Sequence, residues 1–271
     1  MSIEEYRASE GEHYSRLKLA LMSAAHYANP PEPPEDGNPA LLKGSLLHAY
    51  VLERRVVEYV TRPKMAPDDP SKPWNGNRNA CKEWVKAQTL PILKEEDVED
   101  QLGMRRALME NRVVQEILAS CPERERPVFA EYGGLPLKAL LDGAGRDNSG
   151  RRVVFDLKSC RDSSPNGFAK SVSQLKYTLQ LSLYSAVLSL DEKLEERPSW
   201  LWIAVENKKP YNVSVYAPTP QHYDAGERQL EYCVRLVKEC KRTGIYLGYT
   251  DGITDLPWRK WDEFNEPAPT E

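Results

Sequence analysis

The stretch Val153-Val154-Phe155-Asp156-Leu157-Lys158 decides the fold of this chain. Its first three residues are β-branched or aromatic, which is typical of a buried strand. Asp156 and Lys158 follow at the end of that strand, and side chains two residues apart on a strand point to the same face. The stretch therefore predicts a carboxylate and an ammonium group side by side at one end of a buried sheet.

A second carboxylate, Asp142, closes the preceding segment, residues 135–141. Residues 147–150, Asp-Asn-Ser-Gly, form a predicted turn between the two segments. A hairpin would bring Asp142 close to Asp156 and Lys158. These are the parts of a Mg²⁺ site for phosphodiester cleavage, because the hard cation needs oxygen ligands. The lysine can orient the attacking water and offset phosphate charge.

The composition suits one soluble domain of ordinary core size. The chain has 271 residues, of which 40% are hydrophobic and 29% are charged. No stretch approaches the roughly 18 apolar residues of a membrane span. The first residues lack the basic and apolar regions of a signal peptide. We therefore expect a cytoplasmic protein without a membrane partner.

The cysteines and the net charge bound the chemistry further. No CxxC pair occurs, so we expect reduced thiols, with neither a zinc ribbon nor an iron–sulfur cluster. The net charge of −4 argues against a protein that coats DNA by bulk electrostatics. Residues 151–177 nevertheless hold a local excess of basic side chains, which indicates either a basic groove or a solvated face.

Hydrophobic periodicity and turn residues predict a mixed α/β order. We expect helices at 13–27, 39–60, 80–90, 97–119, 166–189 and 221–243. Strands are expected at 127–132, 136–142, 152–158, 200–206 and 211–216, and a polar loop at 63–79. This order favours a central mixed sheet flanked by helices, with an N-terminal helical part over residues 1–120.

A row of polar residues follows the predicted helix 166–189. Gln174, Tyr177, Gln180 and Tyr184 recur at helical spacing beside a stripe of leucines. That spacing places the four on one helix face. The row is either an ordinary surface row or the wall of a hydrated cleft that holds phosphate.

Four more polar residues are candidates for the same site. His48 lies in a predicted helix, where it could supply a nitrogen ligand or a phosphate contact, although lone helical histidines are more often structural. Glu131 ends a predicted strand and could be a third carboxylate, although an exposed strand end is the plainer interpretation. Ser159 and Arg161 follow the lysine, where they could bind a phosphate.

Taken in chain order, the motifs Gly-x-x-x-His, Asp, Asp-x-Lys and Gln-x-x-x-Tyr resemble the RecB-like branch of the PD-(D/E)XK nucleases. They stand here as Gly44 to His48, Asp142, Asp156 to Lys158, and Gln180 to Tyr184. Residues 43–49, 155–159 and 164–172 are similar to the RecE (exonuclease VIII) group of phage recombination exonucleases. The resemblance covers roughly residues 4–262. It implies a restriction-endonuclease-like α/β fold, with one nuclease domain over residues 1–262, a catalytic core at 121–245 and a disordered tail at 263–271.

The resemblance also implies an activity. The expected enzyme is a Mg²⁺-dependent exonuclease, with Mn²⁺ as a substitute, that degrades the 5′ strand of linear duplex DNA. It would leave 3′ single-stranded overhangs for recombination by strand annealing. Relatives assemble into rings around DNA and work beside a single-strand annealing protein. The expected partners are therefore DNA ends, such a recombinase and further copies of the chain.

The same resemblance assigns roles to the metal site. Asp142 and Asp156 become metal ligands, helped by the Leu157 carbonyl. Lys158 positions the attacking water. His48 becomes a metal ligand or a phosphate contact.

The remaining assignments are more peripheral, and two alternatives to an exonuclease stay open. Gln180 and Tyr184 would brace the site and the DNA backbone, whereas the acidic position at Glu131 varies within the pattern. The same core could also act as an endonuclease. It could instead belong to a DNA-binding or assembly protein that retains an inactive nuclease fold.

Overall fold

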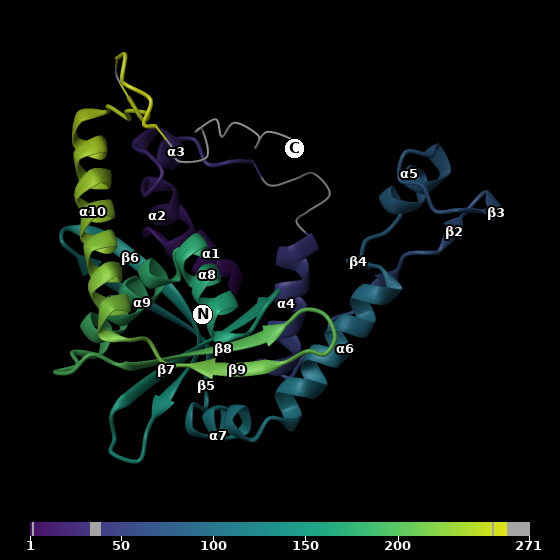
Figure 1. Cartoon of the computed structure of the whole chain (residues 1–271), viewed down its shortest axis with the longest axis horizontal. Coiled ribbons are helices and arrows are strands. Elements are labelled where there is room, and N and C mark those ends of the chain that lie inside the picture. Colours follow the sequence, from purple (N-terminus) through teal and green to yellow (C-terminus); the bar gives the residue numbers. More distant parts are fainter. Residues whose placement is uncertain (2, 33–38, 251, 259–271) are drawn as a thin grey trace, which may run out of the picture.

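A five-stranded mixed sheet forms the centre of the computed structural model, which describes residues 1, 3–32, 39–250 and 252–258 (Figure 1). The strands, in spatial order, are β5 (Glu123–Tyr132), β6 (Leu135–Arg146), β7 (Arg152–Cys160), β8 (Ser199–Glu206) and β9 (Val213–Tyr216). β7 and β8 are parallel, and the other neighbours are antiparallel. All five strands predicted from the sequence are confirmed.

Helices and short strands surround this sheet. The described helices are α1 (Ile3–Ala8), α2 (Tyr14–Ala20), α3 (Ala24–Ala28), α4 (Pro39–Val51), α5 (Asn79–Lys86), α6 (Glu95–Glu110), α7 (Arg112–Ser120), α8 (Pro165–Leu175), α9 (Tyr177–Glu192) and α10 (Pro220–Thr243). The short strands are β1 (Val60–Thr61), β2 (Met65–Ala66), β3 (Asp69–Pro73) and β4 (Ile92–Leu93). Figure 1 shows α5, β2 and β3 at the far end of α6, away from the sheet.

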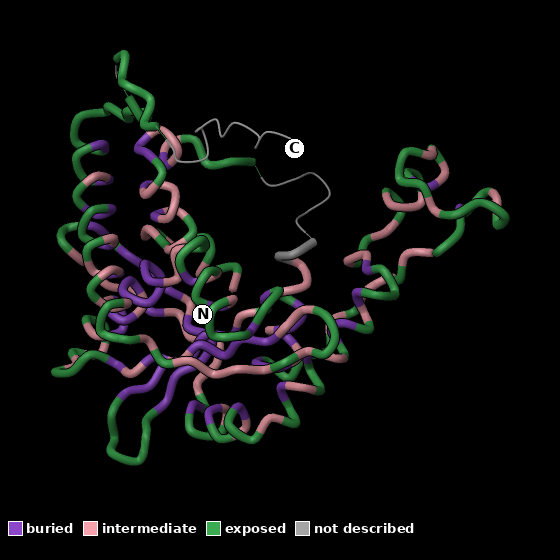
Figure 2. Tube along the Cα trace, in the orientation of Figure 1, coloured by how far each residue is buried: buried purple, intermediate pink, exposed green. Residues whose placement is uncertain are grey.

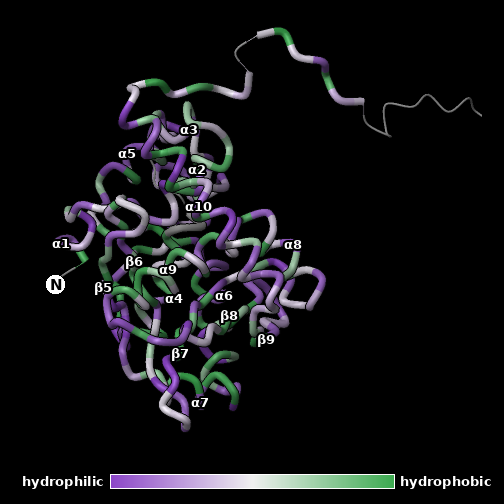
Figure 3. Tube along the Cα trace, turned by 90° about the vertical axis from the view of Figure 1, so that its left-hand side faces the viewer, coloured by the Kyte–Doolittle hydropathy of each residue, from purple (hydrophilic) through white to green (hydrophobic). Residues whose placement is uncertain are grey.

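Alternation along the strands builds a hydrophobic core on each face of the sheet. Val154 of β7 packs into a core with α2, α3, α8, α9 and α10. Its neighbours Val153 and Phe155 pack on the opposite face, with α4, α6 and α7. Figure 2 shows the buried residues concentrated on the strands and on the inner sides of these helices. Figure 3 shows hydrophobic and hydrophilic residues interleaved along the same elements.

Three predicted helices are each divided in the structure. Residues 97–119 form α6 and α7, because Asn111 ends the first helix in an extended conformation and caps the second. Residues 13–27 form α2 and α3, because Ser23 starts a new helix by accepting a hydrogen bond from His26 N at 3.2 Å. Residues 166–189 form α8 and α9, because Lys176 adopts a left-handed conformation with φ of 60°. The helical spacing of apolar residues continues across such a break, so the sequence pattern does not indicate it.

Two other segments differ from the prediction. The helix expected to reach residue 60 ends at Val51, and Arg54 just beyond it has φ of 53°, which is incompatible with an α-helix. The segment 63–79, predicted as a loop, contains the antiparallel pair β2 and β3. The predicted tail at 263–271 lies outside the described residues. In the described part of the chain, no helix is long and apolar enough to cross a membrane.

Candidate active site

The candidate site lies where β6 and β7 separate. The two strands pair from Arg146 and Arg152 as far as Gly143 and Phe155, and no further. Beyond the last pair, the Leu157 N–H donates to Asp142 Oδ2 at 2.7 Å, so a carboxylate takes the place of a strand partner. The fork between the strands therefore begins at the two predicted aspartates, Asp142 and Asp156.

Asp156 is fixed by two neighbours on the α9 side of the sheet. Lys158 Nζ donates to its Oδ1 at 3.0 Å and lies 2.8 Å from its Oδ2. Gln180 of α9 donates to Oδ1 at 2.9 Å. The Lys158 ammonium also lies 4.7 Å from the centre of the Tyr177 ring. Only 1% of Asp156 is exposed, so these contacts hold its carboxylate in one orientation.

His48 and Glu125 complete the donor set on the other side of Asp142. His48 Nε2 lies 3.2 Å from the Leu157 carbonyl oxygen and 3.6 Å from Asp142 Oδ2. Its Nδ1 lies 3.5 Å from Glu125 Oε1. Single ligand atoms of His48, Glu125 and Asp142 all lie within 4.8 Å of one another.

This arrangement fits a divalent cation. Glu125 Oε1 is buried and, apart from the long contact with His48, has no hydrogen-bond partner in the described part of the chain. Buried carboxylate oxygens are normally hydrogen-bonded or coordinate a metal. Carboxylate and carbonyl oxygens are the ligands that Mg²⁺ and Mn²⁺ take, and an imidazole nitrogen is also acceptable to Mn²⁺. Glu125, Asp142, His48 and the Leu157 carbonyl are the groups that would hold it. Asp156 pairs with Lys158 and Gln180 beside them, and its role as a further ligand stays a prediction.

Glu125 was not predicted from the sequence, although a signal for it exists. The two-residue turn Gly133-Gly134 connects β5 to β6. Counting outward from that turn, Arg124 pairs with Gly143, which leaves Glu125 opposite Asp142. Glu125 has φ of 44°, a left-handed conformation that costs a non-glycine residue free energy and is often found at functional sites.

Glu131, the predicted third carboxylate, lies elsewhere. It is exposed near the opposite end of β5 and pairs with Pro136. Asp142 lies six positions after Pro136 on β6, which corresponds to about 20 Å along a strand. The assignment failed because it took the carboxylate at the C-terminal end of β5, whereas the fork lies near the beginning of that strand.

The predicted polar row on the helix is only partly brought together. Because the helix breaks at Lys176, Gln174 remains exposed on α8, whereas Gln180 reaches Asp156 from α9. Tyr177 lies under Lys158. The Tyr184 ring packs edge-on against Trp200 at 6.1 Å, and burial together with the Asp156 charge raises its pKa.

Ser159 and Arg161 are both exposed after the lysine. Strand alternation turns Ser159 to the face opposite Asp156 and Lys158. Arg161 follows the end of β7, outside the fork. No contact in the described residues connects either side chain to the carboxylates, and their roles as phosphate contacts stay predictions.

Burial and the neighbouring charges shift the pKa values of the site residues in opposite directions. Burial raises the pKa of Asp156 to about 6, although the Lys158 charge pulls it down. Burial also raises the pKa of Asp142. Burial lowers the pKa of His48, but Asp142 and Glu125 outweigh it and bring the value to about 9. A bound cation would favour ionised carboxylates and a neutral imidazole, so metal binding would release protons.

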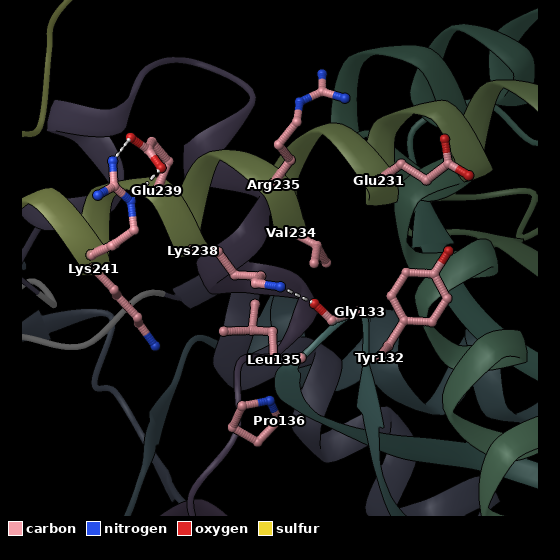
Figure 4. Close-up of a pocket in the computed structure, with 12 residues that line it drawn as sticks. Tyr132, Gly133, Leu135, Pro136, Glu231, Val234, Arg235, Lys238, Glu239 and Lys241 are labelled. Carbon is pink, nitrogen blue, oxygen red and sulfur yellow. Dashed lines mark hydrogen bonds and ion pairs between the residues drawn. The ribbon is translucent and has the colours of Figure 1, made fainter.

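A large cavity lies away from these carboxylates. Figure 4 shows it between α10 and the turn that connects β5 to β6, with a volume of about 1060 Å³. Val234, Leu135 and Pro136 line its apolar part, and the Lys238 ammonium donates to Gly133 O at 2.5 Å. No carboxylate of the fork lines this cavity, so cavity size alone does not locate the candidate site.

Comparisons with known proteins agree with the fold. A candidate exonuclease from Eubacterium rectale is 12% identical, covers 97% of both chains and superposes with a TM-score of 0.62. A second solved structure, SSO0001, is 15% identical over 72% of this chain and 86% of that one, with a TM-score of 0.31. That value is too low to support an argument. No curated protein matches the chain.

A family model identifies the chain more directly. Residues 14–248 match the family described as "PDDEXK-like domain of unknown function (DUF3799)". The match includes all five strands of the sheet and every residue of the fork described above. The mixed sheet flanked by helices is therefore a PD-(D/E)XK nuclease fold, and the chain belongs to the PDDEXK-like DUF3799 family.

Proposed function

We propose that this protein is a Mg²⁺-dependent exonuclease of the RecE-like branch, which degrades the 5′ strand of linear duplex DNA. One observation carries the proposal: Asp142, Asp156 and Lys158 meet at the fork between β6 and β7, beside His48 and the buried Glu125. The name of the Eubacterium rectale structure, which refers to an exonuclease, agrees with it. The products would be 3′ overhangs for strand annealing.

The residues of the chain would divide the work. A bound divalent cation would neutralise charge on the scissile phosphate and favour ionisation of water. Lys158, held against Asp156, would orient the attacking water and stabilise the developing negative charge. Gln180 would keep the Asp156 carboxylate turned toward the fork. DNA would be held through its phosphates, so little sequence preference is expected.

The partners follow from the same proposal. The protein would act on DNA ends in the cytoplasm, beside a single-strand annealing recombinase. It would assemble with further copies of itself into a ring that encloses the duplex. A ring would keep the enzyme on one DNA molecule through many cleavage steps.

The test uses linear duplex DNA labelled separately at its 5′ and 3′ ends, beside a covalently closed circle. Mg²⁺-dependent early release of the 5′ label, with the circle intact, is the expected result. Early release of the 3′ label would contradict the polarity. A nicked circle would favour an endonuclease of the same superfamily, and no cleavage of either DNA would favour a binding protein with an inactive site.

A further inference from the structure

Helix α2 lies beside the candidate site and is attached to the segment that carries Tyr177. The Tyr14 hydroxyl at its first position donates a hydrogen bond to the carbonyl oxygen of Leu175. Leu175 ends α8, two residues before Tyr177, whose ring lies under the Lys158 ammonium. Burial raises the pKa of Tyr14, and the Lys158 charge lowers it, which agrees with this proximity. Tyr14 therefore borders the lysine end of the fork.

Lys18 lies one helical turn after Tyr14. Its ammonium nitrogen is 5.5 Å from the centre of the Tyr14 ring, and the side chain is half-buried. Among the residues that the structure describes, no carboxylate forms an ion pair with it. Burial lowers the pKa of Lys18, and the Lys158 charge lowers it further. Lys18 is thus a half-buried cation over the Tyr14 ring, and no carboxylate of the described residues pairs with it.

An anion bound at this position would stabilise the charged form of Lys18. Partial burial and a like charge both destabilise the ammonium form, whereas a phosphate would stabilise it by direct charge pairing. The Tyr14 ring can hold the ammonium in place through its negative face, but it supplies no formal charge. Lys158 differs from Lys18 in this respect, because the Asp156 carboxylate already neutralises its charge.

We propose that Lys18, positioned by the Tyr14 ring, binds a backbone phosphate of the DNA strand next to the one that is cleaved. This subsite rests on the proposed nuclease function and extends it to a residue on α2. Within the described residues, neither side chain forms a hydrogen bond or an ion pair with a metal ligand, so the subsite acts in DNA binding. A Lys18→Gln substitution should therefore raise KM for DNA and leave kcat nearly unchanged.

The experiment measures binding of a labelled duplex in EDTA at several NaCl concentrations, followed by cleavage kinetics in Mg²⁺. Each phosphate contact contributes about 0.9 to the slope of log K against log salt. Lys18→Gln should make the slope shallower by about 0.9 and weaken binding by about threefold or more, whereas Lys18→Arg should restore both. Mn²⁺ affinity should equal that of the wild type, which excludes an indirect effect on the metal site.

Arg16→Gln is the matched control, because it removes one positive charge from the same helix. Its guanidinium lies 4.7 Å over the Tyr27 ring, and a spacing of two residues turns it to the other side of α2. We expect its salt slope to match the wild type. Duplexes with a 5′-phosphate or a 5′-hydroxyl show whether the bound phosphate is terminal or internal.

The two proposals fail in distinguishable ways. If the wild type cleaves DNA and Lys18→Gln keeps the wild-type slope and KM, the subsite is wrong and the nuclease function stands. The subsite is also wrong if Arg16→Gln and Lys18→Gln lower the slope equally, because the effect is then one of total charge. If the wild type neither binds nor cleaves DNA, both proposals are wrong.

Discussion

Single side chains decide how the fork between β6 and β7 can work. Asp156 receives hydrogen bonds from Lys158 and Gln180, while Asp142 receives one from the Leu157 N–H. The first two contacts orient the Asp156 carboxylate, and the third attaches the Asp142 carboxylate to the backbone of β7. The division of roles that we propose, with metal ligands on one side and a water-positioning lysine on the other, agrees with these contacts.

Lys158→Ala should separate catalysis from metal binding. The variant keeps the carboxylates, so Mn²⁺ affinity measured by calorimetry should remain within a few-fold of the wild type. Loss of the ammonium removes charge stabilisation in the transition state, which should lower kcat by about 10²- to 10³-fold. Circular dichroism and thermal unfolding provide the control for folding. Near wild-type activity would refute the role given to Lys158.

Glu125 and Glu131 provide a matched pair on one strand. Glu125→Gln removes a proposed ligand and should weaken Mn²⁺ binding by about tenfold or more, with a parallel loss of cleavage at low metal concentration. Glu131→Gln makes the same chemical change at an exposed position far from the fork. Equal metal affinity in the two variants would exclude Glu125 from the site.

The sequence indicates some of these residues more directly than others. Asp156 and Lys158 share one strand, so strand alternation alone places them together. The short predicted turn at 147–150 was enough to place Asp142 near them. Glu125 depends on the register of a second hairpin, and His48 comes from a helix more than a hundred residues away along the chain. Contacts over such separations are set by packing and leave no local pattern.

At the scale of elements, strand positions were predicted better than helix boundaries. Each strand of the central sheet has a distinct run of apolar residues, whereas α8 and α9 share one continuous periodicity across Lys176. That break directs Gln180 toward Asp156 and leaves Gln174 exposed. A residue in a left-handed conformation other than glycine carries no clear sequence signal, so the break was not predictable from composition.

The contact between β6 and the end of α7 should be sensitive to one methyl group. A Cβ added at Gly145 would lie 2.1 Å from Ser120 O and 2.5 Å from Cys121 Cα, both backbone atoms that cannot rotate away. Gly145→Ala should therefore lower the free energy of unfolding in urea by about 2 kcal/mol or more. Gly76→Ala is the control, because nothing lies within 4 Å of its added Cβ. Equal stability of the two variants would contradict this close packing of β6 against α7.

At the scale of the whole molecule, an ion cluster joins β5, β7 and α9. Buried Arg152 donates to Glu123 and Glu192, and Arg126 contacts the same two carboxylates. Hydrogen bonds from Arg152 lower the pKa of Glu123. Burial raises the pKa of Glu192, but Arg152 and Arg126 outweigh it and lower the value overall.

This cluster predicts how stability depends on pH. Because both carboxylates have a folded-state pKa below their unfolded value near 4.3, their contribution is present above that pH. It is lost as the pH falls through the depressed folded-state values. The free energy of unfolding should therefore decrease below about pH 4.3. Glu192→Gln should reduce the steepness of that decrease in urea titrations, and an unchanged pH profile would contradict the linkage.

We propose that the fork between β6 and β7 is a metal-dependent nuclease centre. The most direct measurement follows degradation of linear duplex DNA by the wild type and by Asp156→Asn, each in Mg²⁺ and in EDTA. The structure predicts degradation by the wild type in Mg²⁺ alone, and none by a folded Asp156→Asn variant under either condition. Degradation by Asp156→Asn at the wild-type rate, or by the wild type in EDTA, would contradict the claim.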